Sequence, residues 1–501
     1  MIWMRRLPQP LKCVRKNKMS KSPSIKKNFI YSTFYQILSL ITPLITAPYI
    51  SRVLGAEGVG IYSYTSSFAT YFSMVAALGV ASYGNREIAQ HRDNIEQRSR
   101  LFYEIELLVT CTTLCTSLGW LIFSIAYKKY TIYLSILLIQ VLGTAFDISW
   151  FFGGLEQYSY IVIKNTICKL ASVVLLFVLV KNTEDVWLYI LILSGSTAAG
   201  NLSTWTYVPR FLIKVDPKTL NIRKHLKETF VYFVPTIATS VYTVLDKTMI
   251  GLITDSPIEN GYYEQATKII NIAKAIAFTA LNSVLSSRIS YLFSKNKIKE
   301  VKKKIEIALD YILFMGIGIS FGIIGISKWF VPWFFGDGYE EVTVLLILFS
   351  PIVVIIGVSN CAGSLYYTPA GLRRQSTRYI ISGAVINLIM NTILIPGFSC
   401  YGAVIGSLIA ESTITVLYVY HSNGYFTLRK IASHGWKKMV AGIAMLSVIF
   451  LLGYGKIASI NVTVTQVILG GGIYCVTLLI IKDSFFQEVL KIFFKRIGRK
   501  S

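Results

Sequence analysis

The chain has 501 residues, of which 53% are hydrophobic and only 15% are charged, and its mean hydropathy is +0.56. Soluble domains usually carry about 25% charged residues, whereas here long blocks almost without charge follow one another. These features exclude an ordinary soluble enzyme, a disordered chain and a small disulfide-stapled secreted protein. They predict an all-α integral membrane protein.

Fourteen blocks are long enough to cross a membrane as helices, because a bilayer core of about 30 Å needs about 20 apolar residues. In chain order they cover 28–51, 58–83, 101–126, 131–153, 159–180, 186–209, 229–253, 260–287, 305–327, 342–367, 377–395, 401–420, 437–455 and 462–481. Polar residues interrupt the fourth, eighth and tenth blocks. We expect each block to be one transmembrane span.

The formal net charge of +25 has a topological explanation. If the N-terminus is cytoplasmic, the loops on the inner side carry nearly all of the Lys and Arg residues, as membrane proteins prefer. The outer side then carries only Arg52, Lys128, Lys129, Lys181, Lys328 and Lys456. One missed span would exchange inside and outside downstream, so the pattern predicts fourteen spans with both termini in the cytoplasm. Since topology accounts for the excess charge, we expect no nucleic-acid partner.

Both ends of the chain are basic. Residues 1–27 form a predicted cytoplasmic tail; its first part is too short in apolar length for a signal peptide, and we expect that a chain starting at Met19 would lose nothing structural. Residues 483–501 form a second basic tail. Its aromatic and aliphatic residues alternate with basic ones, which predicts an amphipathic helix on the cytoplasmic face of the membrane.

Six spans recur as an internal repeat. The segment RVLGAEGVGIYSY, with Gly60-Ile61-Tyr62, is followed about 200 residues later by IGLITDSPIENGYYEQA, with Gly261-Tyr262-Tyr263. An even number of spans per copy inserts both copies in the same orientation, and parallel repeats are a transporter design that binds its substrate between the halves. The predicted units are a first lobe of six spans, a cytoplasmic linker, a second lobe of six spans and two added C-terminal spans: 28–210, 211–228, 229–421 and 436–482.

Proline residues interrupt the leading helix of each copy, at Pro43 and Pro48 in the first and at Pro235 in the second. Broken helices at corresponding positions of two repeats mark candidate binding regions in transporters. The alternative is an inert kink that neighbouring helices tolerate. The sequence leaves both interpretations open.

Several basic residues lie inside the predicted spans, where an isolated charge costs on the order of 3 kcal/mol. They are Lys169, Lys247, Lys268 and Lys274, with Arg52 at the outer end of the first span. We expect them to line a cationic cavity between the halves, and such a cavity implies an anionic substrate. The alternative is pairing with carboxylates, for which Glu264 and Lys268 have the favourable i,i+4 order.

Sequence motifs for metal binding or catalysis are missing. The chain contains no CxxC, no HExxH and no Walker or GxSxG motif in a credible context, although such spacings accompany most zinc, nucleotide and serine-hydrolase sites. We therefore expect no metal, no cofactor, no direct ATP hydrolysis and no enzymatic activity.

Three segments carry a family resemblance: ITAPYISRVLGAEGVGIYSYTSSFATYFSMVAALGVASYGNREIA, AFDISWFFGGLEQYSYIVIKNTICKL and LDKTMIGLITDSPIENGYYEQATKI. They resemble the Wzx-type polysaccharide repeat-unit flippases of the MOP exporter superfamily, which also contains the MATE drug exporters and the lipid II flippases. The resemblance extends over essentially the whole chain.

The resemblance implies two six-helix lobes around a central cavity. It also implies translocation of an undecaprenyl-diphosphate-linked oligosaccharide from the inner to the outer leaflet of the bacterial cytoplasmic membrane, for capsule, O-antigen or exopolysaccharide assembly. Membrane lipids, a polysaccharide polymerase and chain-length proteins are the implied partners. The substrate-binding residues that it indicates are Arg52, Lys247, Lys268, Asp147 and Trp150. The last two spans would help to form a groove for the lipid tail.

Physical considerations agree with this expectation. A diphosphate head cannot cross the hydrocarbon unaided, but outward movement of two negative charges gains about 4.6 kcal/mol per 100 mV of inside-negative potential. An inward proton or sodium ion would add to this driving force, with Asp246, Glu264 and Glu411 as candidate ion sites.

Two alternatives are a MATE-like cation-coupled multidrug exporter and a membrane polysaccharide polymerase. The exporter would need an acidic cavity. The polymerase would need a large outer loop, whereas every outer loop predicted here is short.

Overall fold

The structure, a computed structural model, describes residues 25–497, without the side chains of 25–30, 32, 234–236, 238–243, 279–284 and 493–497. Helices and short connections make up this described part of the chain, which contains no β-strand. The start of the predicted N-terminal tail and Met19 lie outside it.

Seven α-helices form in the described part of the first half of the chain. They are α1 Ile25–Ala77, α2 Val80–Gln90, α3 Ile95–Ala126, α4 Thr131–Gly143, α5 Ser149–Gly154, α6 Tyr158–Leu179 and α7 Val186–Thr204. The first two predicted spans share α1, which bends at Gly55, where φ is 66°. Glycine suits this bend because a residue with a Cβ rarely adopts positive φ. The first arm of α1 contains Pro43 and Pro48.

Nine α-helices form in the described part of the second half. They are α8 Ile222–Thr254, α9 Pro257–Ser294, α10 Ile298–Phe335, α11 Glu340–Phe349, α12 Ile352–Ala362, α13 Arg373–Tyr420, α14 Leu428–Gly453, α15 Ile460–Ile480 and α16 Ser484–Ile497. The predicted eleventh and twelfth spans share α13, which bends at Ser399. Pro235 falls within α8, among residues whose side chains the structure does not describe.

The fourteen predicted blocks all lie in helical segments, with short irregular connections inside some of them. The polar interruptions of the fourth and tenth blocks coincide with the junctions between α4 and α5 and between α11 and α12, whereas the eighth block is the continuous helix α9. Among the described residues, ten helical segments are long and apolar enough to cross a membrane, and two of these, Thr33–Gln90 and Arg373–Tyr420, hold 58 and 48 residues. These features make the chain an all-helical, multi-pass membrane protein.

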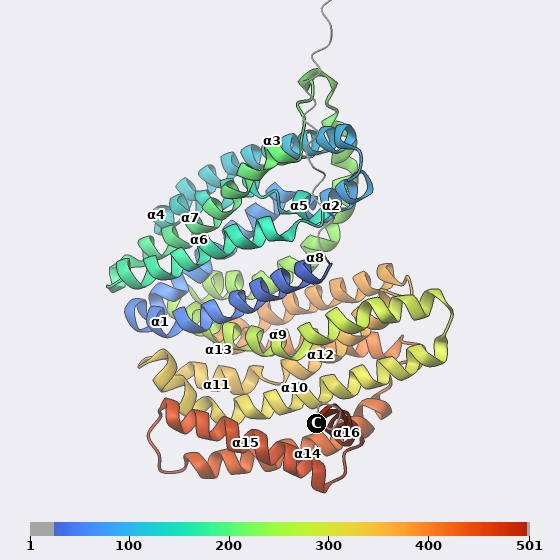
Figure 1. Cartoon of the computed structure of the whole chain (residues 1–501). Coiled ribbons are helices and arrows are strands. Elements are labelled where there is room, and N and C mark those ends of the chain that lie inside the picture. The colour runs from blue at the N-terminus through green and yellow to red at the C-terminus, as the bar shows by residue number, and fades with distance from the viewer. Residues whose placement is uncertain (1–24, 498–501) are drawn as a thin grey trace, which may run out of the picture.

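Figure 1 shows two stacked groups of helices. The first helix group, α1–α7, surrounds buried side chains such as Leu54, Trp120 and Phe151, and the second helix group, α8–α13, surrounds Ile250, Leu309 and Val404. Helices α14 and α15 pack on the outer side of α10. The two groups correspond to the two repeats in the sequence, and their division into functional lobes stays a prediction.

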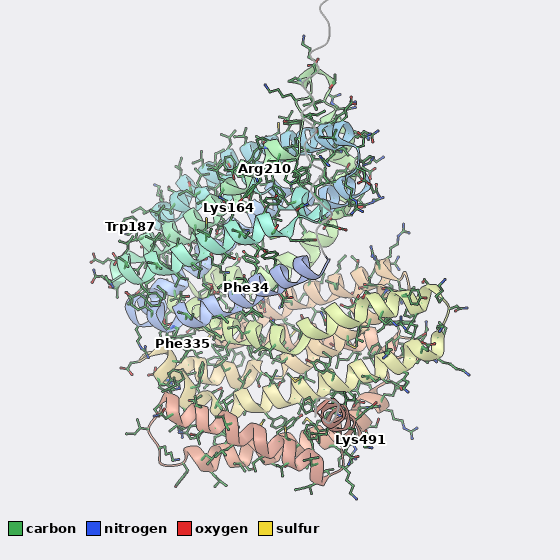
Figure 2. The ribbon with its side chains drawn as sticks, in the orientation of Figure 1. Phe34, Lys164, Trp187, Arg210, Phe335 and Lys491 are labelled. Atoms are coloured by element: carbon green, nitrogen blue, oxygen red, sulfur yellow. The ribbon has the colours of Figure 1, made fainter. Side chains whose placement is uncertain are left out.

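The two ends of the bundle are named here by residues labelled in Figure 2. The Trp187 end, at the left, also holds Phe335 and the connections α6–α7 and α10–α11. The Lys491 end, at the right, holds the connection α9–α10 and helix α16. The helices run between these two ends, as they would between the two faces of a membrane.

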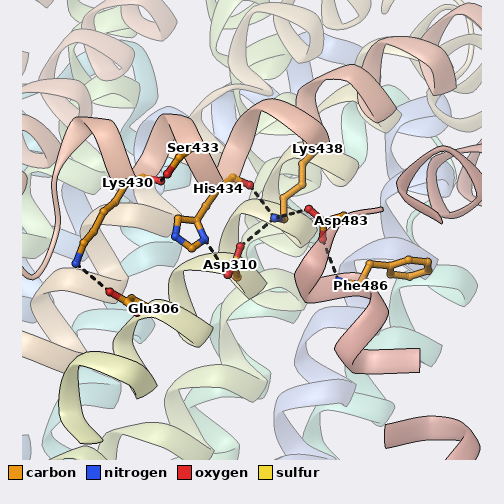
Figure 3. A network of polar contacts seen from close by, with 8 residues as sticks. All are labelled: Glu306, Asp310, Lys430, Ser433, His434, Lys438, Asp483 and Phe486. Atoms are coloured by element: carbon orange, nitrogen blue, oxygen red, sulfur yellow. Dashed lines mark hydrogen bonds and ion pairs between the residues drawn. The ribbon is translucent and has the colours of Figure 1, made fainter. Parts of the chain in front are cut away.

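A polar network attaches α14 and α16 to α10 at the Lys491 end (Figure 3). The ammonium group of Lys438, 1% exposed, lies 3.0 Å from Asp310 Oδ1 and 3.2 Å from Asp483 Oδ2. Asp310 also lies 2.9 Å from His434 Nδ1. Asp483 accepts a hydrogen bond from the backbone N–H of Phe486 and so caps the predicted amphipathic helix. This buried lysine therefore joins two carboxylates from different segments of the chain and is the counter-charge that they share.

We expect Lys438→Ala to lower the free energy of unfolding by about 3–5 kcal/mol, because it leaves two carboxylates without their buried counter-charge. The neighbouring Lys437 is partly exposed and its ammonium group donates a hydrogen bond of 2.8 Å to the backbone oxygen of Lys482, so Lys437→Ala should cost only about 1 kcal/mol. Unfolding of the purified variants in detergent measures the difference. Equal stability of the two variants would contradict a structural role for this network.

Candidate functional site

A cavity of about 540 Å³ lies between α1, α4, α6 and α7 and reaches Glu264 and Lys268 on α9. We name it the Lys169 cavity. Its wall also contains uncharged polar side chains from α1, α4, α6 and α7: Thr42, Thr46, Gln140, Asn165, Ser172, Ser194, Ser196, Thr197 and Asn201. Its volume is within the range of about 300–1,000 Å³ that is usual for small-molecule sites. Cations, amides and hydroxyls on one wall suit a ligand with both anionic and hydroxyl groups.

Lys169 projects from the middle of α6 toward the first arm of α1. Its ammonium group donates a hydrogen bond of 3.0 Å to Ser39 Oγ and lies 5.7 Å from the centre of the Tyr35 ring. Neither partner is a carboxylate, so its positive charge is not neutralised by these contacts. The half-buried Lys169 therefore offers a cation to the cavity.

The carboxylate of Glu264 contacts two lysines and a serine. Its Oε2 lies 2.5 Å from Lys247 Nζ of α8, and its Oε1 lies 3.6 Å from Lys268 Nζ one helical turn away. Ser63 of α1 donates a hydrogen bond of 3.0 Å to Oε2. We call these four residues the Glu264 cluster. Its side chains come from both helix groups, so it joins the first group to the second.

The second arm of α1 crosses α9 so closely that only glycine fits. A Cβ atom on Gly60 would lie 1.7 Å from the backbone oxygen of Pro257, and one on Gly261 would lie 2.0 Å from that of Ala56. These are the two glycines of the sequence repeat. Near the crossing, Gln265 donates a hydrogen bond of 2.7 Å to Ser51. The repeat thus places its two copies face to face, toward the Trp187 end.

Asp246 occupies a separate site inside the second helix group. Its carboxylate accepts hydrogen bonds from the amides of Asn387 and Asn391, at 3.1 and 2.6 Å, and from the hydroxyls of Ser407, at 2.5 Å, and Tyr263. Asn391 Oδ1 is buried without a hydrogen-bond partner among the described residues. One carboxylate therefore meets only neutral groups from α9 and α13.

Other predicted site residues lie outside the Lys169 cavity. Arg52 is exposed and donates a hydrogen bond to the backbone oxygen of Trp333 at the end of α10. Lys274, partly buried on α9, makes no hydrogen bond or ion pair with any residue whose side chain the structure describes. Glu411 is buried on α13. These three residues do not share the cavity wall with Lys169.

Asp147 and Trp150 lie at the start of α5. Asp147 is exposed and accepts a hydrogen bond of 3.0 Å from the backbone of Ser149. The buried Trp150 stacks on Phe102 and lines a smaller hollow of about 320 Å³ that shares Tyr35 with the Lys169 cavity. These contacts hold α5 in place beside Tyr35, which lines both hollows.

The neutral polar residues of the Lys169 cavity and of the Asp246 site were not predicted, because only charged residues stand out within an apolar span. Asn387 and Asn391 stand four residues apart within an otherwise apolar run, a spacing that places two amides on one helix face. That signal was present and could have been used. No group of three His, Cys, Asp or Glu residues that could hold a metal occurs in the described part of the chain.

Comparison with known proteins identifies the family. The family described as "Polysaccharide biosynthesis protein" matches residues 25–293, more than half of the chain. The chain belongs to this family of polysaccharide biosynthesis proteins. This family agrees with the resemblance that the sequence predicts.

Individual relatives agree with this assignment. The chain is 24% identical over 410 residues to a protein of Escherichia coli K12 named "Putative O-antigen transporter", covering 79% of this chain and 95% of that protein. Its fold is similar to that of "Lipid II flippase MurJ, inward closed conformation", with a TM-score of 0.69 at 15% identity over 93% of this chain and 100% of the other. An outward-facing MATE family transporter of the MOP superfamily gives a TM-score of 0.55 at 13% identity, with 86% of this chain and 99% of the other chain covered. The predicted MATE-like fold is confirmed.

We expect Gly60→Ala to lower the free energy of unfolding by about 1–3 kcal/mol, because the new methyl group meets the backbone of α9 and forces the helices apart. Gly195→Ala on α7 is the matched control, since its Cβ would meet nothing within 4 Å. Thermal unfolding in detergent measures both. A Gly60→Ala protein as stable as the control would show that the crossing tolerates a wider spacing.

Proposed function

We propose that the protein flips a polyprenyl-diphosphate-linked oligosaccharide across the bacterial cytoplasmic membrane by alternating access. The observation that carries this proposal is the Lys169 cavity, whose wall combines Lys169 of the first helix group with Lys268 of the second. Two cations can bind the diphosphate, while the surrounding amides and hydroxyls can bind sugar hydroxyl groups. The polyprenyl tail stays in the lipid, so the protein shields only the polar head.

The charge of the cavity favours this substrate over a cationic drug. The described wall contains a single carboxylate, Glu264, and that group already contacts two lysines. A drug cation would find no unpaired negative charge there, whereas an anion would find two lysines. The family match and the O-antigen relative support a glycan as the rest of the substrate.

The scarcity of basic residues at the Trp187 end supports an orientation with this end outside the cell. Lys128, Lys129, Lys181, Lys328 and Lys456 are among the few on that side, and cytoplasmic loops are richer in Lys and Arg. We therefore place the Trp187 end outside the cell and both termini in the cytoplasm. The close crossing of α1 and α9 would then close the outer side in this arrangement, with the ion pair of 2.5 Å between Lys129 and Asp255 at the same end.

Replacing either cavity lysine should slow transport. We expect Lys169→Ala and Lys268→Ala each to reduce flipping of a lipid-linked saccharide in proteoliposomes by at least about tenfold, because each loses a charge-assisted hydrogen bond to the diphosphate. Lys164→Ala is the control on the same helix, since Lys164 (Figure 2) lies over the Tyr207 ring and not on the cavity wall. Unchanged flipping in both cavity variants would contradict the proposal.

We further propose that Asp246 couples transport to an ion gradient. A buried carboxylate surrounded by neutral amides and hydroxyls lacks a counter-charge, so it can accept one proton or one sodium ion moving inward. Rotation of the Asn387 or Asn391 amide would present oxygen atoms to a sodium ion, since amide groups both donate and accept. The contacts of this carboxylate favour it as a coupling site over Glu264, which is already paired with lysines.

We expect Asp246→Asn to abolish the acceleration of flipping by an imposed sodium or proton gradient, because the neutral amide cannot bind the ion. Proteoliposomes with each gradient in turn, at fixed membrane potential, identify the ion in the wild type. Asp337→Asn, an exposed position, serves as control. Full gradient dependence in Asp246→Asn would exclude this residue as the coupling site.

A further inference from the structure

Glu264 stands at the boundary between the two helix groups and faces the substrate cavity. It lines the Lys169 cavity, its side chain is 9% exposed, and Lys268 and Lys247 are 21% and 23% exposed. Lys268 lines the cavity too, but Lys247 does not. The carboxylate of Glu264 therefore lies between Lys247 and the space in which a substrate would bind.

The repeat gives this carboxylate a neutral counterpart. Ser63 stands three residues after Gly60, and Glu264 stands three residues after Gly261. The corresponding positions of the two copies are thus hydrogen-bonded to each other, at 3.0 Å, beside the glycine crossing. One copy supplies a negative charge and the other only a hydroxyl group, so the cluster holds one carboxylate for two lysines.

We propose that Glu264 acts as an internal substitute for the substrate diphosphate, and that the diphosphate displaces it from Lys247 and Lys268. This inference rests on the proposed function and names the residue that senses the substrate. A diphosphate carries about two negative charges and several acceptor oxygens, so it neutralises both lysines more fully than one carboxylate can. When the Glu264 carboxylate is displaced, its hydrogen bond with the Ser63 hydroxyl breaks.

Loss of the bond between Ser63 and Glu264 would weaken the contact between α1 and α9. This contact helps to hold the two helix groups together toward the Trp187 end, with the glycine crossing, the bond from Gln265 to Ser51 and the contacts of Arg52 and Lys129 with the second group. Substrate binding is thereby linked to separation of the groups on the outer side. In the empty protein, Glu264 contacts both lysines, and its bond with Ser63 helps to keep the outer side closed.

The alternative is a permanent structural role, in which Glu264 only neutralises the two lysines. The two roles predict opposite effects of removing its charge. If Glu264 competes with the substrate, Glu264→Gln frees both lysines and tightens anion binding. If Glu264 is structural, the same change disorders the cluster and leaves binding unchanged or weaker.

The first experiment measures binding of inorganic diphosphate to the purified full-length protein in nanodiscs by calorimetry at low ionic strength. We expect Glu264→Gln to bind about tenfold more tightly than wild type, within the range of one added charge interaction near a protein surface. Glu259→Gln, which removes a carboxylate from the same helix away from the lysines, should bind like wild type. Equal or weaker binding by Glu264→Gln, in protein that elutes and unfolds like wild type, overturns the proposal.

A second variant covers the case in which Glu264→Gln does not fold. We expect Lys247→Gln to weaken diphosphate binding at least about tenfold, although Lys247 does not line the cavity, because the displaced Glu264 exposes it to the ligand. Binding equal to wild type would show that Glu264 never leaves Lys247, and would overturn the proposal. A wild-type protein that binds no diphosphate contradicts the proposed function itself.

The second experiment measures separation of the helix groups. Spin labels at Glu184→Cys and Asp337→Cys, both exposed positions near the Trp187 end, report the distance between the groups in a background without native cysteines. We expect diphosphate to lengthen this distance, and Ser63→Ala to lengthen it without ligand while diphosphate affinity stays within about twofold of wild type. A distance that responds to neither change overturns the link between Glu264 and opening.

Discussion

A charged side chain within a membrane-embedded bundle needs an opposite charge, a polar neighbour or water. The structure meets this requirement in three ways. Lys438 is buried between two carboxylates, Lys169 faces a polar cavity with only a serine and an aromatic ring as partners, and Lys247 and Lys268 share one carboxylate. Only in the first arrangement does the lysine contact two carboxylates, and that lysine is 1% exposed, which leaves no access for a ligand. The incomplete balance of the other two is what makes them candidates for substrate binding.

The sequence was sufficient to predict the helices and the fold class. Long apolar blocks and the alternation of basic loops depend on local composition, and a bilayer imposes the same length on every span. The sequence did not reveal that the spans on either side of Gly55, and those on either side of Ser399, form one bent helix. A bend and a loop both interrupt an apolar run, so the two look alike in the sequence.

The candidate site was only partly predictable from charge. Lys169 and Lys268 were expected in the cavity and lie on its wall, but Arg52 was expected with them and instead reaches the end of α10. Sequence separation concealed the pairing of Lys247 with Glu264, since the two residues stand on different helices. The Asn387 and Asn391 amides beside Asp246 carry no charge, so a prediction based on charged residues did not include them.

The two arms of α1, on either side of Gly55, contribute residues to different parts of the structure. The first arm supplies Tyr35, Thr42 and Thr46 to the cavity wall, and the second arm supplies Gly60 and Ser63 to the crossing with α9. Apart from its neighbours in the chain and the helix's own backbone, no described residue has an atom within 4 Å of a Cβ built on Gly55, so no other helix packs against the junction at that position. A bend with positive φ and open space beside it allows the two arms to change their angle, so that the cavity wall can tilt when the contact between α1 and α9 is released.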